Sequence, residues 1–134
     1  MDYAIRTTVE QPFDQALAAA RAVLADQGFG VLTEIDLAAT LKAKLDVDIA
    51  PQVILGACRP PLAHAAIQAE PSIGLLLPCN VVVRSLPHGA TLVEAMDPEV
   101  MVTMTRNENL VDVATEARER LTNALIALHG TLTD

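Results

Sequence analysis

The chain has 134 residues, of which 51% are hydrophobic and 19% charged, a balance typical of one folded domain spanning residues 1–134. A chain of this length can bury enough surface to fold without disulfides or a structural metal. Its net charge of −8 and its lack of a basic cluster argue against nucleic acids and anionic membrane surfaces as partners, because both are bound through clustered lysine and arginine.

Strand and helix patterns alternate along the first part of the chain. Residues 3–9 alternate apolar and polar side chains, which is the period of a strand with one buried face. Residues 13–27 carry apolar side chains at helical spacing and predict an amphipathic helix. Residues 30–35 predict a second strand, and Asp36 can cap a short helix over residues 37–46.

The middle of the chain is richer in strands. Residues 52–57 are apolar on both faces and predict a central strand, which a proline-initiated helix over residues 61–70 follows. Residues 72–77 are apolar but contain a glycine, and we interpret them as an extended return segment. Residues 80–86 and 91–96 flank a Pro-His-Gly turn and predict an antiparallel hairpin.

The C-terminal part is predicted to be helical. Asp97 and Pro98 begin a single helical turn, and a long amphipathic helix over residues 110–128 ends at Gly130. Two topologies fit this order of elements, a doubly wound parallel sheet and an α+β fold with an antiparallel meander. The short middle helices favour the second, of the type β-α-β(4)-α, with short helices inserted between strands and the long helices packed on one face.

Cys58 is the residue that most suggests chemistry. It follows the predicted central strand and precedes a helix N-terminus, where the helix dipole and the neighbouring Arg59 would both stabilise a thiolate. Such a thiol could be a nucleophile, a redox centre or part of an anion pocket. The alternative is a buried cysteine that packs as a small hydrophobe.

The position of Cys79 depends on the topology. If the strands at 52–57 and 80–86 are antiparallel neighbours, Cys58 and Cys79 face each other at one edge, with Asn80 beside them. If those strands are parallel, the two thiols lie roughly 20 Å apart at the rise of a strand.

His64 is the candidate third member of this site, either as a metal ligand with the two cysteines or as a base for Cys58. Further soft or borderline donors are His88, Met96, Met101 and Met104. We interpret His88 as a turn residue and the three methionines as core side chains. Closed zinc sites usually show paired ligands at short spacing, and this chain has none.

Other catalytic signatures are missing from the sequence. It contains no dinucleotide-binding loop, no P-loop and no G-x-S-x-G elbow, so it names no cofactor. Asp36 and Asp97 are better explained as helix caps than as an acid/base pair, and Glu34 as a solvent-facing strand residue. No targeting segment and no apolar run of membrane-spanning length is found, so we expect a cytoplasmic protein with reduced thiols.

A series of motifs runs in order along nearly the whole chain: Q-G-F-G-V-L-T-E-I-D, K-L-D-V-D, I-L-G-A-C-R-P-P-L-A-H-A-A, L-L-P-C-N-V-V-V and A-M-D-P-E. In these motifs the chain resembles the domain-of-unknown-function 302 family. The resemblance implies an α+β fold related in topology to the repeat of the TATA-box-binding protein, and a homodimer. It implies no activity, because none is established for the family.

Two features set the chain apart within that family. Similar members usually read C-N-P where this chain has Cys58-Arg59-Pro60, so a guanidinium replaces an amide. Another branch lacks both cysteines, so the thiols are not required by the shared fold. We therefore expect any thiol function to belong to a subset of the family.

We expect a cytoplasmic, homodimeric binding or accessory domain that is not an enzyme. Its pocket would be formed by Cys58, Arg59, His64, Cys79 and Asn80, and would suit a small anion, a thiol-reactive ligand or a soft metal. Two alternatives stay open. The first is a thiol enzyme in which Cys58 attacks and His64 is the base, and the second is a purely structural domain with a dimer interface.

Overall fold

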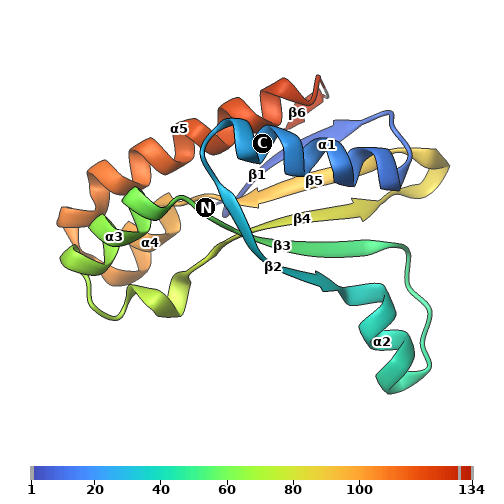
Figure 1. Cartoon of the computed structure of the whole chain (residues 1–134), viewed down its shortest axis with the longest axis horizontal. Helices are drawn as coiled ribbons and strands as arrows, with labels where there is room; N and C mark the ends of the chain where they lie inside the picture. The colour runs from blue at the N-terminus through green and yellow to red at the C-terminus, as the bar shows by residue number, and fades with distance from the viewer. Residues whose placement is uncertain (1, 130, 134) are drawn as a thin grey trace.

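The fold is α+β and is built on an antiparallel sheet, as predicted. The computed structural model describes residues 2–129 and 131–133, and the strand order is β2-β3-β4-β5-β1-β6, with every neighbouring pair antiparallel (Figure 1). The strands are β1 (Ala4–Val9), β2 (Gly30–Asp36), β3 (Gln52–Cys58), β4 (Cys79–Ser85), β5 (Thr91–Met96) and the short β6 (Thr131–Thr133). The helices are α1 (Phe13–Asp26), α2 (Leu37–Leu45), α3 (Pro60–Ala69), α4 (Glu99–Thr105) and α5 (Val111–Ala127). Strands β2 to β5 form the expected meander, so the doubly wound parallel alternative is wrong.

One face of the sheet carries the core. The two long helices, α1 and α5, lie side by side over this face (Figure 1). The side chains beneath them alternate along each strand, as the period of a half-buried sheet requires. On β3, for example, Val53, Leu55 and Ala57 are at most 4% exposed. The small alanines of α1, Ala16 and Ala20, let that helix approach the sheet closely.

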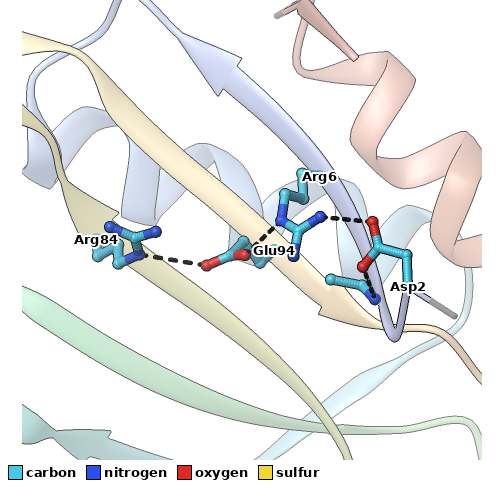
Figure 2. A network of polar contacts seen from close by, with 5 residues as sticks. Asp2, Arg6, Arg84 and Glu94 are labelled. Atoms are coloured by element: carbon cyan, nitrogen blue, oxygen red, sulfur yellow. Dashed lines mark hydrogen bonds and ion pairs between the residues drawn. The ribbon is translucent and has the colours of Figure 1, made fainter. Parts of the chain in front are cut away.

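The opposite face carries a row of charged side chains from three adjacent strands (Figure 2). Arg6 Nε donates to Glu94 Oε2 at 2.8 Å, and Arg84 Nε donates to Glu94 Oε1 at 3.3 Å. Arg6 Nη1 also reaches Asp2 Oδ2 at 2.7 Å, which lowers the pKa of that carboxyl. These contacts connect β1, β5 and β4 on a face that lacks the covering helices.

Two predicted segments differ from the structure. Residues 72–77 do not form an extended strand, because Ile73–Leu76 is a 3₁₀ turn whose backbone bonds are local. The local bonds run from Leu75 N to Ser72 O and from Leu77 N to Gly74 O, so this segment needs no strand partner. The turn expected after Pro98 is the seven-residue helix α4, and β6 is a strand that the sequence did not predict.

Several local predictions are confirmed. Asp36 caps α2 by accepting a hydrogen bond from Ala39 N at 2.9 Å. The long C-terminal helix agrees with α5, although its expected end at Gly130 lies outside the described residues. Across the described ranges, no helix combines the length and apolar character that a bilayer span requires.

Candidate functional site

The register of β3 and β4 brings the two cysteines together. Cys58 is the last residue of β3 and Cys79 is the first of β4. In the antiparallel ladder between these strands, Ala57 faces Cys79, so the two thiols lie at the same edge of the sheet. Both cysteines are free thiols. Cys58 therefore lies one residue beyond the direct partner of Cys79, at the same end of the two strands, and the parallel arrangement that would separate the two cysteines is wrong.

Both cysteines line one small cavity of about 30 Å³. A water molecule needs about 10–15 Å³ of such space, so a species of about that size fits in the cavity. Helices α3, α4 and α5 close the cavity against the edge of the sheet, and its walls are mainly apolar. The apolar walls include Leu62, Ala66, Leu77, Val113 and Ala117.

Cys79 is buried and is a neutral thiol at neutral pH. It is 7% exposed, and burial raises its pKa to about 11, with the nearby Cys58 as the second cause. A thiolate in this mainly apolar site would lose its hydration, which disfavours the charged form. Cys79 is therefore poorly suited to act as a free nucleophile. Cys58 is only partly buried.

Arg59 brings positive charge to the cavity. Its side chain lines the cavity wall and is 21% exposed, and its Nη1 lies 3.4 Å from Glu116 Oε2 of α5. The guanidinium crosses directly over Gly28, where a Cβ atom would lie 2.9 Å from Arg59 Nε. Gly28 also has a φ of +84°, a left-handed backbone conformation that favours glycine. This position therefore needs glycine both for its backbone conformation and to leave space for the Arg59 side chain. The buried Arg59 Nε has no hydrogen-bond partner.

Two of the predicted site residues lie away from the cavity. His64 is on the first half of α3 and Asn80 is the second residue of β4, and both side chains are exposed. Neither lines the cavity. The structure thus unites Cys58, Arg59 and Cys79. Over the ranges 2–129 and 131–133, no three histidine, cysteine, aspartate or glutamate side chains are grouped so as to hold a metal ion.

The residues on α4 and α5 that complete the site were not assigned to it from the sequence. Met101 of α4 lines the cavity, whereas Met104 on the same helix is 66% exposed. Val113 and Ala117 of α5 close the opposite side. Their spacing of four residues indicates a shared helix face, but a sequence pattern does not say what that face covers.

The carboxylates that were considered for acid/base chemistry have structural contacts instead. Asp97 Oδ1 accepts a hydrogen bond from Glu99 N at 3.0 Å, at the start of α4. Its Oδ2 accepts another from Arg118 Nε at 3.2 Å. Glu34 is exposed and forms an ion pair with Arg21. These contacts agree with the prediction of helix-capping and surface roles.

Comparison with known proteins supports the family assignment. A family model described as "Domain of unknown function DUF302" matches residues 5–128. The crystal structure of the uncharacterized conserved protein DUF302 from Bacillus stearothermophilus superposes with a TM-score of 0.86 at 26% sequence identity. That match covers 94% of this chain and 98% of the other. No curated protein matches the chain. Its sequence, its fold and this structural neighbour together show that the chain belongs to the DUF302 family.

Proposed function

We propose that this protein is a binding module that holds a small thiophilic ligand between Cys58 and Cys79. The observation that carries the proposal is that both cysteine residues line one cavity of about 30 Å³. The two thiols are the most reactive groups at the cavity, because its other walls are almost entirely apolar. A ligand of this size with affinity for sulfur fits both the volume and the lining.

A small anion, the other ligand class expected from the sequence, is less well supported. Arg59 is the cationic side chain of the cavity, and it already interacts with Glu116. An anion entering the apolar space would lose its hydration with few hydrogen-bond donors to replace it. Cys79 does not favour an anion either, because burial keeps it as a neutral thiol, which supplies no positive charge.

A titration with Hg(II), which two thiolates bind linearly, tests the dithiol site. We expect one equivalent of Hg(II) to consume both free thiols of the reduced protein, as counted with a colorimetric thiol reagent. Cys58→Ser and Cys79→Ser are matched controls, and each should bind Hg(II) through its single remaining thiol with lower affinity. Far-ultraviolet circular dichroism verifies that both variants are folded. If the wild-type protein binds two equivalents, one at each thiol independently, the proposed function is wrong.

The thiol-enzyme alternative lacks a comparable observation. A nucleophilic cysteine needs a base within hydrogen-bond reach, and His64 is exposed and does not line the cavity. Cys79 is protonated at neutral pH. We therefore favour a binding role over catalysis. We also propose a cytoplasmic location, because a dithiol site has to stay reduced in order to bind its ligand.

We further propose that the protein works as a homodimer joined through its β2–α2 arm, which we define as residues 30–49. Every residue of β2 is exposed, α2 has no buried residue, and α2 lies apart from the other helices (Figure 1). Six of the twelve large hydrophobic residues that are exposed in the described chain belong to this arm. They are Val31, Leu32, Ile35, Leu45, Val47 and Ile49.

The size of this apolar surface suits a second copy of the chain. From the exposed fractions of the six side chains, we calculate roughly 500 Å² per copy, so that two copies would bury roughly 1,000 Å², near the lower bound for a specific interface. The outer edge of β2 also has no strand partner within the described chain. A two-fold dimer uses the same patch twice and covers both surfaces at once.

Light scattering after size-exclusion chromatography tests the dimer. We expect the wild-type protein to elute as a dimer and Ile35→Lys, which places a charge in the middle of the arm, to elute as a monomer. Ile126→Lys is the matched control, because Ile126 is 56% exposed on α5, outside the arm. A monomeric wild type, or a dimer that Ile35→Lys leaves intact, would refute the arm interface without affecting the dithiol site.

A further inference from the structure

A third sulfur-bearing side chain meets the two cysteines at the cavity. Met101 lines it from α4 and is 2% exposed, so its thioether is shielded from water. The position of α4 is fixed at its start by Asp97, which binds both Glu99 N and Arg118 Nε of α5. Three separate elements, β3, β4 and α4, thus each contribute one sulfur residue to a single small space.

On the basis of the proposed dithiol function, we propose that the ligand is a monovalent soft metal ion, with Cu(I) as its biological representative. The ion would be bound by Cys58 Sγ and Cys79 Sγ, with Met101 Sδ as the third donor. Thiolate and thioether ligands select Cu(I) over harder ions. Methionine suits the third position because its flexible side chain and polarizable sulfur adapt to an irregular site.

The same cavity disfavours harder divalent ions. Zinc in closed sites is held by four nitrogen, sulfur or carboxylate ligands. Within the described ranges, no three histidine, cysteine, aspartate or glutamate side chains come together. Calcium and magnesium require several oxygen ligands or retained waters. A small cavity with mainly apolar walls offers few polar groups to such an ion or to its waters.

The charge balance also favours a monovalent ion. Two thiolates and one monovalent cation carry a net charge of −1, which the guanidinium of Arg59 at the cavity wall offsets. A divalent ion would make that group neutral, so the charge of the guanidinium would be offset by Glu116 alone. Glu116 is half exposed and also pairs with Arg120 at 3.1 Å, so its contact with Arg59 at 3.4 Å offsets that charge only in part.

Binding releases protons. Two neutral thiols and one monovalent cation give a bis-thiolate complex with a charge of −1 and two protons, so charge and atoms balance. The thiolate is the form of cysteine that binds a metal, so the ion has to displace the proton of each thiol. The apparent affinity should therefore rise by at least about tenfold for each pH unit in the neutral range.

The test is an anaerobic Cu(I) titration in competition with a chromophoric Cu(I) chelator. We compare the wild type with Met101→Leu, which removes the thioether and nearly conserves volume, so stability should change by less than about 1.5 kcal/mol. Met104→Leu is the matched control, since Met104 is exposed on the same helix. We expect Met101→Leu to weaken Cu(I) binding by at least about tenfold and Met104→Leu to leave it unchanged. X-ray absorption should show three sulfur neighbours in the wild type and two in Met101→Leu.

The Hg(II) titration separates the possible failures. Hg(II) needs the two thiols alone, so its binding to Met101→Leu should match that of the wild type. If Hg(II) binds one to one but Cu(I) fails to bind, or binds equally well to Met101→Leu, the Cu(I) assignment is overturned and the dithiol site stands. If Hg(II) binds the two thiols independently, both proposals are overturned. A thermal melt confirms that each variant is folded.

Discussion

Gly56, in the middle of β3, packs so tightly that even one added methyl group should destabilise the protein. A Cβ atom at this position would overlap Thr33 Oγ1 on β2 and lie 2.8 Å from Pro78 Cγ. Pro78 immediately precedes Cys79 and itself lines the cavity. The proline ring has little freedom to move, so the strands must separate or the threonine must change rotamer.

The magnitude follows from two opposing effects. Overpacking a tightly filled site costs about 1–3 kcal/mol. Alanine restricts the unfolded chain more than glycine does, which returns about 0.4–1 kcal/mol. We therefore expect Gly56→Ala to lower the free energy of unfolding by about 1–2 kcal/mol. In a domain of this size, that corresponds to a fall in Tm of about 4–8 °C.

Denaturant unfolding followed by circular dichroism measures this effect. Gly74→Ala is the matched control, because a Cβ atom at Gly74 would meet nothing within 4 Å. Adding Thr33→Ala to Gly56→Ala removes the nearest obstacle and should recover part of the lost stability, while the contact with Pro78 remains. If Gly56→Ala is no less stable than Gly74→Ala, the packing argument is wrong.

Four further predictions concern the side chains of Cys79, Asp2 and Asp97. Alkylation of Cys79 should be slow at neutral pH and accelerate toward pH 11, and a rate that levels off below pH 9 would contradict the raised pKa. Cys58→Ser should lower the pKa of Cys79 only in part, because burial is a larger cause of the shift than Cys58. Because the folded-state pKa of Cys79 is raised above its ordinary value of 9.0, its contribution to stability is complete below pH 9 and is lost as the pH rises toward 11. Arg6→Gln should return the pKa of Asp2 toward its ordinary value of 3.8, as followed by NMR titration, because the side-chain hydrogen bond from Arg6 is the main cause of the lowering (Figure 2). Asp97→Ala should cost about 1.5 kcal/mol in denaturant unfolding through the lost cap of α4, and Asp97→Asn, which can still cap, should cost less.

Most elements could be predicted from local patterns. The alternation in β1 and the helical spacing in α1 and α5 each reflect an apolar face that has to be buried. Asp36 was correctly predicted to be a helix cap because its short carboxylate reaches a backbone N–H two or three residues ahead. The failures were apolar segments without a clear period. Ile73–Leu76 is a 3₁₀ turn. A segment this short that contains a glycine can form a turn or an extended strand, so its sequence does not decide between the two.

The site was predictable only in part. The antiparallel pairing of β3 and β4, which places Cys58 and Cys79 at the same end of the two strands, followed from the predicted meander, and the ladder confirms it. His64 lies one helical turn from the start of α3, but its side chain is exposed, because the helix directs Leu62 and Ala66 toward the cavity instead. The relation of this topology to the TATA-box-binding protein repeat stays a prediction.

The sequence by itself determined most element types and their order, because these depend on neighbours within a few residues. It left two topologies for the sheet, and the antiparallel one predicted that the two cysteines lie at the same end of adjacent strands. Only the tertiary structure decided that Met101 and the 113–117 face of α5 meet Cys58, Arg59 and Cys79 around one cavity. Helix periodicity shows that a face is apolar, but the surface it covers depends on how the remote segments of the chain pack together. The proposed soft-metal site, whose outermost residues are 43 positions apart, depends on that packing.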